Sequence, residues 1–259
     1  GTLETDAITL GGASFIKVEG TDFTGSLLVG HSTTGTLDAA QYNTGVGLTA
    51  LDALTTGDNN TTLGYGAGSA ITTASSCVFI GSGAGDAITG ASDNVAVGAG
   101  ALSGTGTASS SAYNVAVGKD AMNVSNGARF NVAIGKDAGR TITAGDYNIV
   151  IGAEAAENLT SGQGNVIIGA NVDVSSATGD RELIIHGNSG DDQTTWIQGD
   201  SSGNITMPAE LAAVSLDISG AIDVDGTTNL DAVDIDGAVQ IDGTVTVCLL
   251  YTSPEPTRL

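Results

Sequence analysis

The sequence predicts an all-β protein, a β-solenoid or β-roll made of 17-residue coils, and three observations support this. A five-residue motif, Asn-x-x-(Val/Ile/Leu)-Gly, recurs along the chain, and its closing glycines keep a constant spacing that is broken at only one place. Gly accounts for 39 of the 259 residues, whereas aromatic residues are only 4%. Abundant Gly supplies turns, and so few large side chains would fill a wide globular core poorly. A thin fold of stacked coils satisfies both conditions.

The charge of the chain excludes several classes of partner. Asp and Glu number 29 against 7 Lys and Arg, which gives a formal net charge of −22. Nucleic-acid binding needs clustered basic residues, and anionic membranes repel such a chain, so neither partner is expected. No apolar run is long enough for a membrane-spanning helix, which requires roughly 18 residues or more. We therefore expect no nucleic acid and no membrane insertion in this segment.

Residues 1–25 are expected to form an N-terminal strand segment, and residues 26–181 the solenoid. The clearest copies of the motif place their Asn and closing Gly in a fixed register: Asn94 and Gly98, Asn114 and Gly118, Asn131 and Gly135, Asn148 and Gly152, Asn165 and Gly169. The stacked Asn amides are expected to bond coil to coil. The step from Gly98 to Gly118 is longer than the others, and its extra residues fall within 104–113, which we expect to bulge out as a loop.

Each coil is expected to contain two short strands. The first spans the motif, and the second surrounds an aliphatic residue seven positions after the closing Gly, such as Leu54 or Ile71. At about 3.3 Å per strand residue, 17 residues make one closed circuit, whereas helical repeats run to about 33 residues or more. Nine circuits stacked about 4.8 Å apart make a rod of about 43 Å.

The first strand also predicts an association between chains. Its second and fourth positions, as in Val95 and Val97, are expected to share the inner face because side chains alternate along a strand. The third position is then expected to face outward, yet it is apolar in Ala96, Ala116, Ala133, Val150 and Ile167. An outward apolar column indicates packing against another copy of the chain.

Three segments follow the solenoid. Residues 182–210, which hold the only Trp, Trp196, are expected to form a hairpin-rich connector, and residues 211–247 acidic strand repeats. Residues 248–259 resemble a translated DNA library adapter, which predicts that the native sequence stops near Val247 and that the chain is a metagenomic fragment; the alternative is a genuine disordered tail. The acidic repeats contain weak candidates for Ca²⁺ ligands, although a solvated face is the favoured interpretation: Asp223, Asp225, Asp234 and Asp236.

The columns Asn-Val-Ala-Val-Gly…Ala resemble the β-roll heads of trimeric autotransporter adhesins. The segments 216–226, 233–243 and 1–11 look like the strand repeats of bacteriophage tail fibres of the marine type. These resemblances imply a homotrimer in the virion tail that attaches to a host cell-surface glycan or protein. The coil is longer than the usual adhesin coil, which leaves handedness and cross-section open.

No catalytic constellation is apparent, so the chain is not expected to be an enzyme or to carry a cofactor. The only histidines, His31 and His186, lie in different repeat contexts, and Cys77 occupies an Asn position of the repeat. The expected function is host-surface attachment as part of a tail fibre, with Trp196 and the loop 104–113 as receptor contacts. The alternatives are a bacterial trimeric surface adhesin and, from another class, an ice-binding β-solenoid. The last rests on a column of threonines eight positions past the closing Gly: Thr55, Thr72, Thr89, Thr143 and Thr160.

Overall fold

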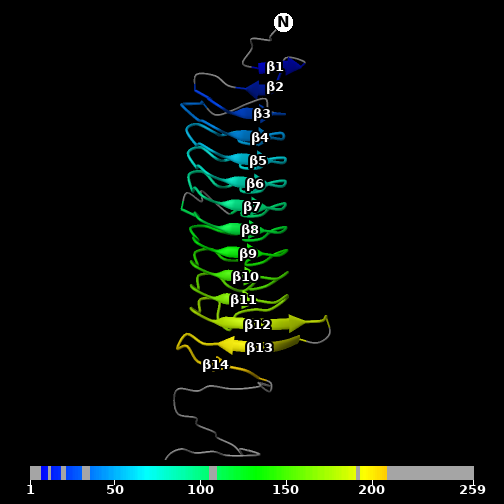
Figure 1. Ribbon diagram of the computed structural model, residues 1–259, viewed down its shortest axis with the longest axis vertical. Helices are drawn as coiled ribbons and strands as arrows, with labels where there is room; N and C mark the ends of the chain where they lie inside the picture. Colours follow the sequence, from blue (N-terminus) through cyan, green and yellow to red (C-terminus); the bar gives the residue numbers. More distant parts are fainter. Residues whose placement is uncertain are drawn as a thin grey trace, which may run out of the picture. The chain divides into compact units, whose positions relative to one another are not determined.

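A computed structural model describes residues 7–10, 13–18, 22–30, 36–104, 110–190 and 193–208. These residues belong to the first of two units, Gly1–Leu211; the second, Ala212–Leu259, lies outside the described residues, as do the predicted acidic repeats and tail. The described residues contain no helix, and their 14 strands form one sheet whose order follows the chain (Figure 1). The predicted all-β solenoid with a 17-residue period is confirmed.

The central part of the sheet is a parallel stack with one strand from each coil. Each strand residue pairs with the residue 17 positions later, as Val132 does with Ile149, except across the insertion, where Val95 pairs with Val115. The stack comprises β3 (Leu27–Val29), β4 (Thr44–Val46), β5 (Thr61–Leu63), β6 (Val78–Ile80), β7 (Val95–Val97), β8 (Val115–Val117), β9 (Val132–Ile134), β10 (Ile149–Ile151), β11 (Val166–Ile168) and β12 (Leu183–Asn188).

Antiparallel strands cover both ends of the parallel stack. β1 (Ala7–Leu10) pairs with β2 (Ala13–Val18), which pairs with β3. At the other end β12 pairs with β13 (Gln193–Gly199), which pairs with β14 (Ile205–Thr206). The first and last coils are therefore not left as open edges, which would template the pairing of other chains.

The closing glycines are required by the distance between successive coils. At Gly118 φ is +137°, and a Cβ there would lie 2.2 Å from the carbonyl oxygen of Gly135 in the next coil. Any side chain would thus collide with the backbone of the next coil in a region of φ that L-residues rarely adopt. The same contact repeats from coil to coil, which explains why glycine recurs in register.

The prediction of a second strand in each coil is wrong for the described residues. Residues two and four positions after the closing Gly are left-handed, for example Gly100 with φ of 67° and Leu102 with φ of 52°. Two such residues bend the chain too sharply for a strand. The segment instead consists of turns that bond to the next coil, as where the Leu102 N–H donates to the Ala121 carbonyl at 2.9 Å.

The predicted faces of the first strand are also reversed. The third-position residues are all buried, whereas the second and fourth positions are half-buried or exposed. The Asn of the motif is fully buried and lies two positions before the third strand position, so alternation places both on the inner face. The prediction that the third position faces outward is therefore wrong, and these residues line the interior: Ala96, Ala116, Ala133, Val150 and Ile167.

In several coils, side chains on opposite sides of the narrow interior complement one another in size. A large residue at the third strand position faces a small residue four positions after the closing Gly: a Cβ on Gly85 would lie 2.4 Å from Cε2 of Phe79. In three other coils the strand residue is small and the partner is large and fully buried: Gly45 with Leu51, Ala96 with Leu102 and Ala116 with Met122. The coil of β9 differs, because Ala133 and Gly139 are both small and a Cβ on Gly139 would lie 2.7 Å from Cδ1 of Ile142. Cores this tightly packed are sensitive to small changes in volume.

Candidate interaction surfaces

The column of repeated Asn residues is an internal ladder. The Asn131 Oδ1 accepts hydrogen bonds from the Asn148 backbone N–H at 2.9 Å and from its Nδ2 at 3.0 Å. The Asn131 Nδ2 donates to Asn114 Oδ1 at 3.1 Å and to the Gly145 carbonyl at 2.8 Å. The same side-chain pairing joins Asn94 to Asn114 and Asn148 to Asn165. Because these amides are buried and bonded to one another, they hold the coils together and offer nothing to a ligand.

Cys77 interrupts this ladder and has the properties of a structural thiol. Its side chain is fully buried, and its Sγ lies 3.5 Å from the Ser75 carbonyl oxygen and 3.6 Å from that of Ala91. Burial raises the pKa of the Cys77 thiol from 9.0 to about 11, outweighing the backbone hydrogen bonds that lower it. A thiol that stays protonated at neutral pH is a poor nucleophile.

The histidines do not complete a catalytic pair with this thiol in the described part of the chain. His31 lies outside the described residues. His186 is buried next to Gly169, where it takes the place of the closing glycine in the following coil, and its Nδ1 lies 3.2 Å from the Thr195 Oγ1. Its Nε2 is buried and has no hydrogen-bond partner among the described residues. The side chain therefore belongs to the junction between β12 and β13.

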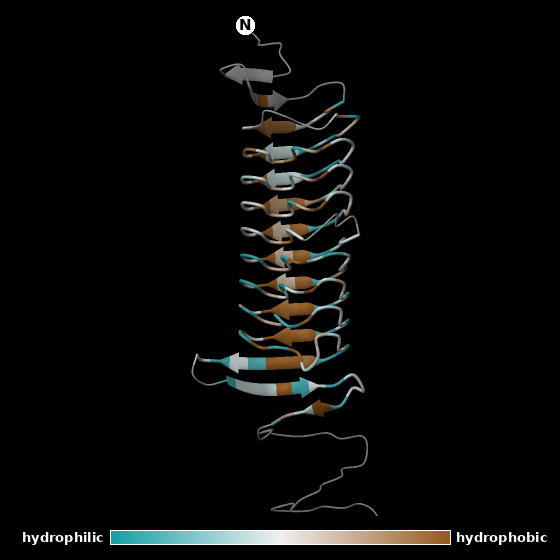
Figure 2. Ribbon diagram, turned by 180° about the vertical axis from the view of Figure 1, so that it is seen from behind, coloured by the Kyte–Doolittle hydropathy of each residue, from teal (hydrophilic) through white to brown (hydrophobic). Residues whose placement is uncertain are grey.

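A continuous apolar surface covers the outer face of the parallel sheet. We call it the outer stripe: the second and fourth motif positions of β3 to β12, all of which are aliphatic except Thr44 and Thr61. Figure 2 shows hydrophobic strands stacked from β6 to β11, most strongly at β10 and β11. The most exposed aliphatic members retain between 37% and 49% of their surface: Leu63, Ile80, Ile134, Ile149, Ile151 and Ile168.

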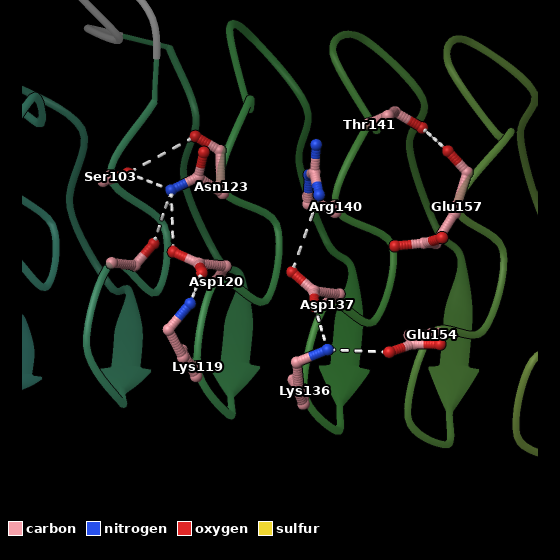
Figure 3. Close-up of polar contacts among 11 residues, drawn as sticks. Ser103, Lys119, Asp120, Asn123, Lys136, Asp137, Arg140, Thr141, Glu154 and Glu157 are labelled. Carbon is pink, nitrogen blue, oxygen red and sulfur yellow. Dashed lines mark hydrogen bonds and ion pairs between the residues drawn. The ribbon is translucent and has the colours of Figure 1, made fainter.

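An ionic network borders this stripe one and two positions after the closing glycines. Lys136 contacts Asp137 at 2.8 Å and Glu154 at 2.7 Å, and Lys119 pairs with Asp120 (Figure 3). Hydrogen bonds to Asp137 and then Glu154 raise the pKa of Lys136 above its usual range. These cations are already paired with carboxylates, so the border is not a ready site for an anionic ligand.

A ladder of aromatic rings stands on another corner of the coils. Tyr113, Phe130 and Tyr147 each precede a motif Asn, and their rings stack with centroids 4.8 and 4.9 Å apart and an interplanar angle of 1°. The rings are exposed, but their faces contact one another, so mainly their edges meet solvent. The ladder thus stabilises the stack of coils more readily than it offers a stacking face.

Trp196 provides an isolated, accessible aromatic face. It is 55% exposed and lies on β13 against Gly187 of β12: a Cβ on Gly187 would be 2.5 Å from the Trp196 Cζ2. Beside it is an open pocket of about 330 Å³ lined by Gly187, Asn188, Ser189, Thr194 and Trp196. The length and pairing of β12 and β13 are not readable from residue periodicity, so the sequence singled out Trp196 but missed Gly187.

The threonine column considered for ice binding is engaged within the solenoid. The Oγ1 of Thr55 donates to the Thr72 carbonyl at 2.9 Å, and that of Thr143 to the Thr160 carbonyl at 3.2 Å. The Thr72 and Thr160 hydroxyls make the same bond to the next coil. These hydroxyls therefore bridge coils, which weakens the argument for an ice-binding array.

Two predicted regions fall outside the described residues: the weak calcium candidates Asp223, Asp225, Asp234 and Asp236, and positions 105–109 of the inserted loop. Within the part of the chain that the structure describes, no group of three or more His, Cys, Asp or Glu side chains is placed to hold a metal ion. No helix in that part is long and apolar enough to cross a membrane.

The chain matches no protein-family model, no curated protein sequence and no solved structure.

Proposed function

We propose that this chain is a segment of a homotrimeric bacteriophage tail fibre that attaches the virion to a host cell surface. The outer stripe carries the proposal. It joins ten parallel strands, contains no charged residue, and at about 4.8 Å per strand extends for about 43 Å. A chain with a net charge of −22 that keeps one continuous face free of charge has a strong candidate for an interface.

The exposed fractions of the side chains in the outer stripe allow an estimate of the free energy gained when another subunit covers it. Fully burying an aliphatic side chain stabilises by about 1.5–3 kcal/mol, and the six most exposed aliphatic members each retain between 37% and 49% of their surface. Covering these six alone would contribute roughly 4–7 kcal/mol per subunit. The stripe is only two side chains wide, so three stripes facing one axis would cover both columns in every subunit.

This arrangement suits attachment by mechanical rigidity and multivalency. Coils joined by the Asn ladder and by backbone bonds make a stiff support, and three subunits present three copies of each surface site. Linked sites bind with an effective concentration that raises avidity without any new contact. A bacterial trimeric surface adhesin would use the same architecture, and the genes flanking the coding sequence separate the two: tail genes support a phage fibre, and a membrane-anchor segment supports the adhesin.

The trimer is tested by placing a charge on the stripe. Ile151 is 37% exposed and outward, so Ile151→Lys is compatible with a folded coil but places ammonium groups in the interface. Ser161→Lys is the matched control, because it adds the same charge at an exposed turn away from the strand. Light scattering coupled to size exclusion should give a trimer for the unmodified chain and the control, and smaller species for Ile151→Lys. A monomeric unmodified chain would refute the proposal, and a dimer would refute its stoichiometry.

A further inference from the structure

We propose that Trp196 and Gly187 form a stacking platform for one neutral hexopyranose unit of a glycan. This inference rests on the attachment function proposed above and specifies where a host glycan would bind. The platform consists of the indole of Trp196 on β13, the glycine beneath it on β12, and the polar groups of Asn188 and Thr194 beside it.

The absence of a side chain at Gly187 allows the indole to lie against the sheet. A Cβ at this position would be 2.5 Å from Cζ2 and 3.0 Å from Cε2 of Trp196, far inside van der Waals contact. One face of the ring is therefore supported by the strand, while 55% of the residue remains exposed. A ring held flat in this way loses little conformational freedom when a ligand stacks on it.

A bulge in the hairpin directs Trp196 to this position. Residues 195 and 197 pair with residues 186 and 185, so Trp196 is the extra residue between two consecutive pairs. Bulges re-aim side chains and are over-represented beside functional sites. Ile197, which pairs with Ile185, continues the outer face, so Trp196 is an additional apolar group rather than a member of the regular alternation.

The platform lies outside the outer stripe. β11 pairs only with residues 183–185 of β12, whereas Gly187 is two positions farther along the same strand. β12 and β13 project beyond the edge of the coils (Figure 1). A trimer closed through the stripe would therefore leave three such platforms at the periphery, where a surface glycan can reach them.

The chemistry of the pocket favours a neutral sugar. Its volume of about 330 Å³ accommodates a single pyranose ring with its hydroxyl groups, and no basic side chain lines it. Pyranoses with several axial C–H bonds on one face stack on an aromatic ring through that face. The exposed Thr194 hydroxyl can donate and accept, and the Asn188 amide is held in place because its Nδ2 donates to the Ala170 carbonyl at 3.2 Å and its Oδ1 accepts from the Gly190 N–H at 2.7 Å.

The chain contains a single Trp, so intrinsic fluorescence reports on this site alone. We would titrate the full chain with methyl β-glucopyranoside and methyl β-galactopyranoside, using sorbitol as an acyclic control with similar hydroxyl content. The expected result is a saturable change for at least one pyranoside, at the millimolar concentrations typical of one weak contact, and none with sorbitol.

Three variants retain the reporter. Gly187→Ala displaces the indole and should weaken binding by about tenfold or more, and Thr194→Ala, which removes an exposed hydroxyl, by about fivefold. Gln198→Ala, on the same strand but outside this pocket, is the matched control and should bind normally.

Equal responses to sorbitol and the pyranosides, or no saturable response, would overturn the inference. It would equally be overturned if Trp196 emission changed with protein concentration without sugar, because a second copy would then cover the platform. Light scattering on the same samples reports the oligomeric state separately, so a failure of sugar binding is distinguishable from a failure of the proposed trimer.

Discussion

Exchanging the sizes of Phe79 and Gly85 would test how the interior is packed. Phe79 is fully buried at the third position of β6, and Gly85 provides the space that its ring occupies. In the next coil the sizes are reversed, with Ala96 on the strand and Leu102 four positions after the closing Gly. The double variant Phe79→Ala/Gly85→Leu therefore gives one coil the arrangement that its neighbour already has.

The magnitudes follow from the cavity, the clash and the backbone. Phe79→Ala alone should cost about 3–5 kcal/mol through lost burial and the cavity left behind. Gly85→Leu alone places Cβ 2.4 Å from the Phe79 ring, which adds about 1–3 kcal/mol of overpacking to about 1–2 kcal/mol for a left-handed leucine. That backbone is accessible to leucine, because Leu102 has φ of 52° where Gly85 has 60°. In the double variant the new leucine fills the cavity and recovers about 1.5–3 kcal/mol.

The assay is a double-mutant cycle from urea unfolding followed by circular dichroism. We expect the two substitutions together to cost about 3 kcal/mol less than the sum of the singles. Phe79→Ala combined with Gly139→Leu is the control: Gly139 has the same left-handed backbone but lies three coils away, so these effects should add. Additive effects at positions 79 and 85 would refute size exchange within the coil.

Other predictions concern the ladder and its interruption. Asn131→Ala should destabilise the chain by about 3 kcal/mol or more, since it removes the side-chain bond to Asn114 and leaves the Gly145 carbonyl and the Asn148 backbone N–H without their bonds to Asn131; an unchanged melting temperature would contradict this. Cys77→Asn should raise stability by about 1 kcal/mol by joining the two halves of the ladder, visible as a higher urea midpoint; a lower midpoint would show that the site cannot hold an amide. With Cys248→Ser as background, Cys77 should not react with a thiol reagent at pH 8 until urea is added, because its pKa is about 11 in the fold. The folded state keeps this proton where the unfolded state begins to lose it, so stability should fall as pH rises from about 9.0 to about 11, and Cys77→Ser should lack that fall.

Much of the fold could be predicted because the 17-residue period is marked by Gly and Asn residues, whose steric and hydrogen-bonding roles are strict. The closing Gly of the coils from β4 to β11 reflects a close backbone contact with the next coil that leaves no room for a side chain. A buried Asn in register reflects an amide ladder, which Cys77 interrupts. The reversed faces were also predictable in principle, since a buried Asn places the third strand position inside by alternation. The second strand was a wrong inference because apolar spacing does not reveal left-handed residues such as Leu102 and Met122.

The candidate surfaces depended on the structure to a greater extent. Trp196 stood out in the sequence as the only Trp, but its contact with Gly187 depends on how β12 and β13 pair and on the bulge between them. That pairing is antiparallel and lies outside the 17-residue period, so no repeat specifies it. The exposed apolar stripe likewise became visible only once the inner and outer faces were assigned.

The sequence by itself determined the period, the parallel stacking and the glycine and asparagine columns, because each is a local requirement repeated in every coil. Tertiary structure alone decided how large and small side chains share one coil and where Trp196 stands. Those features depend on groups that meet across the coil or across the terminal hairpin, and the strength of such contacts depends on distance and volume rather than on spacing along the chain.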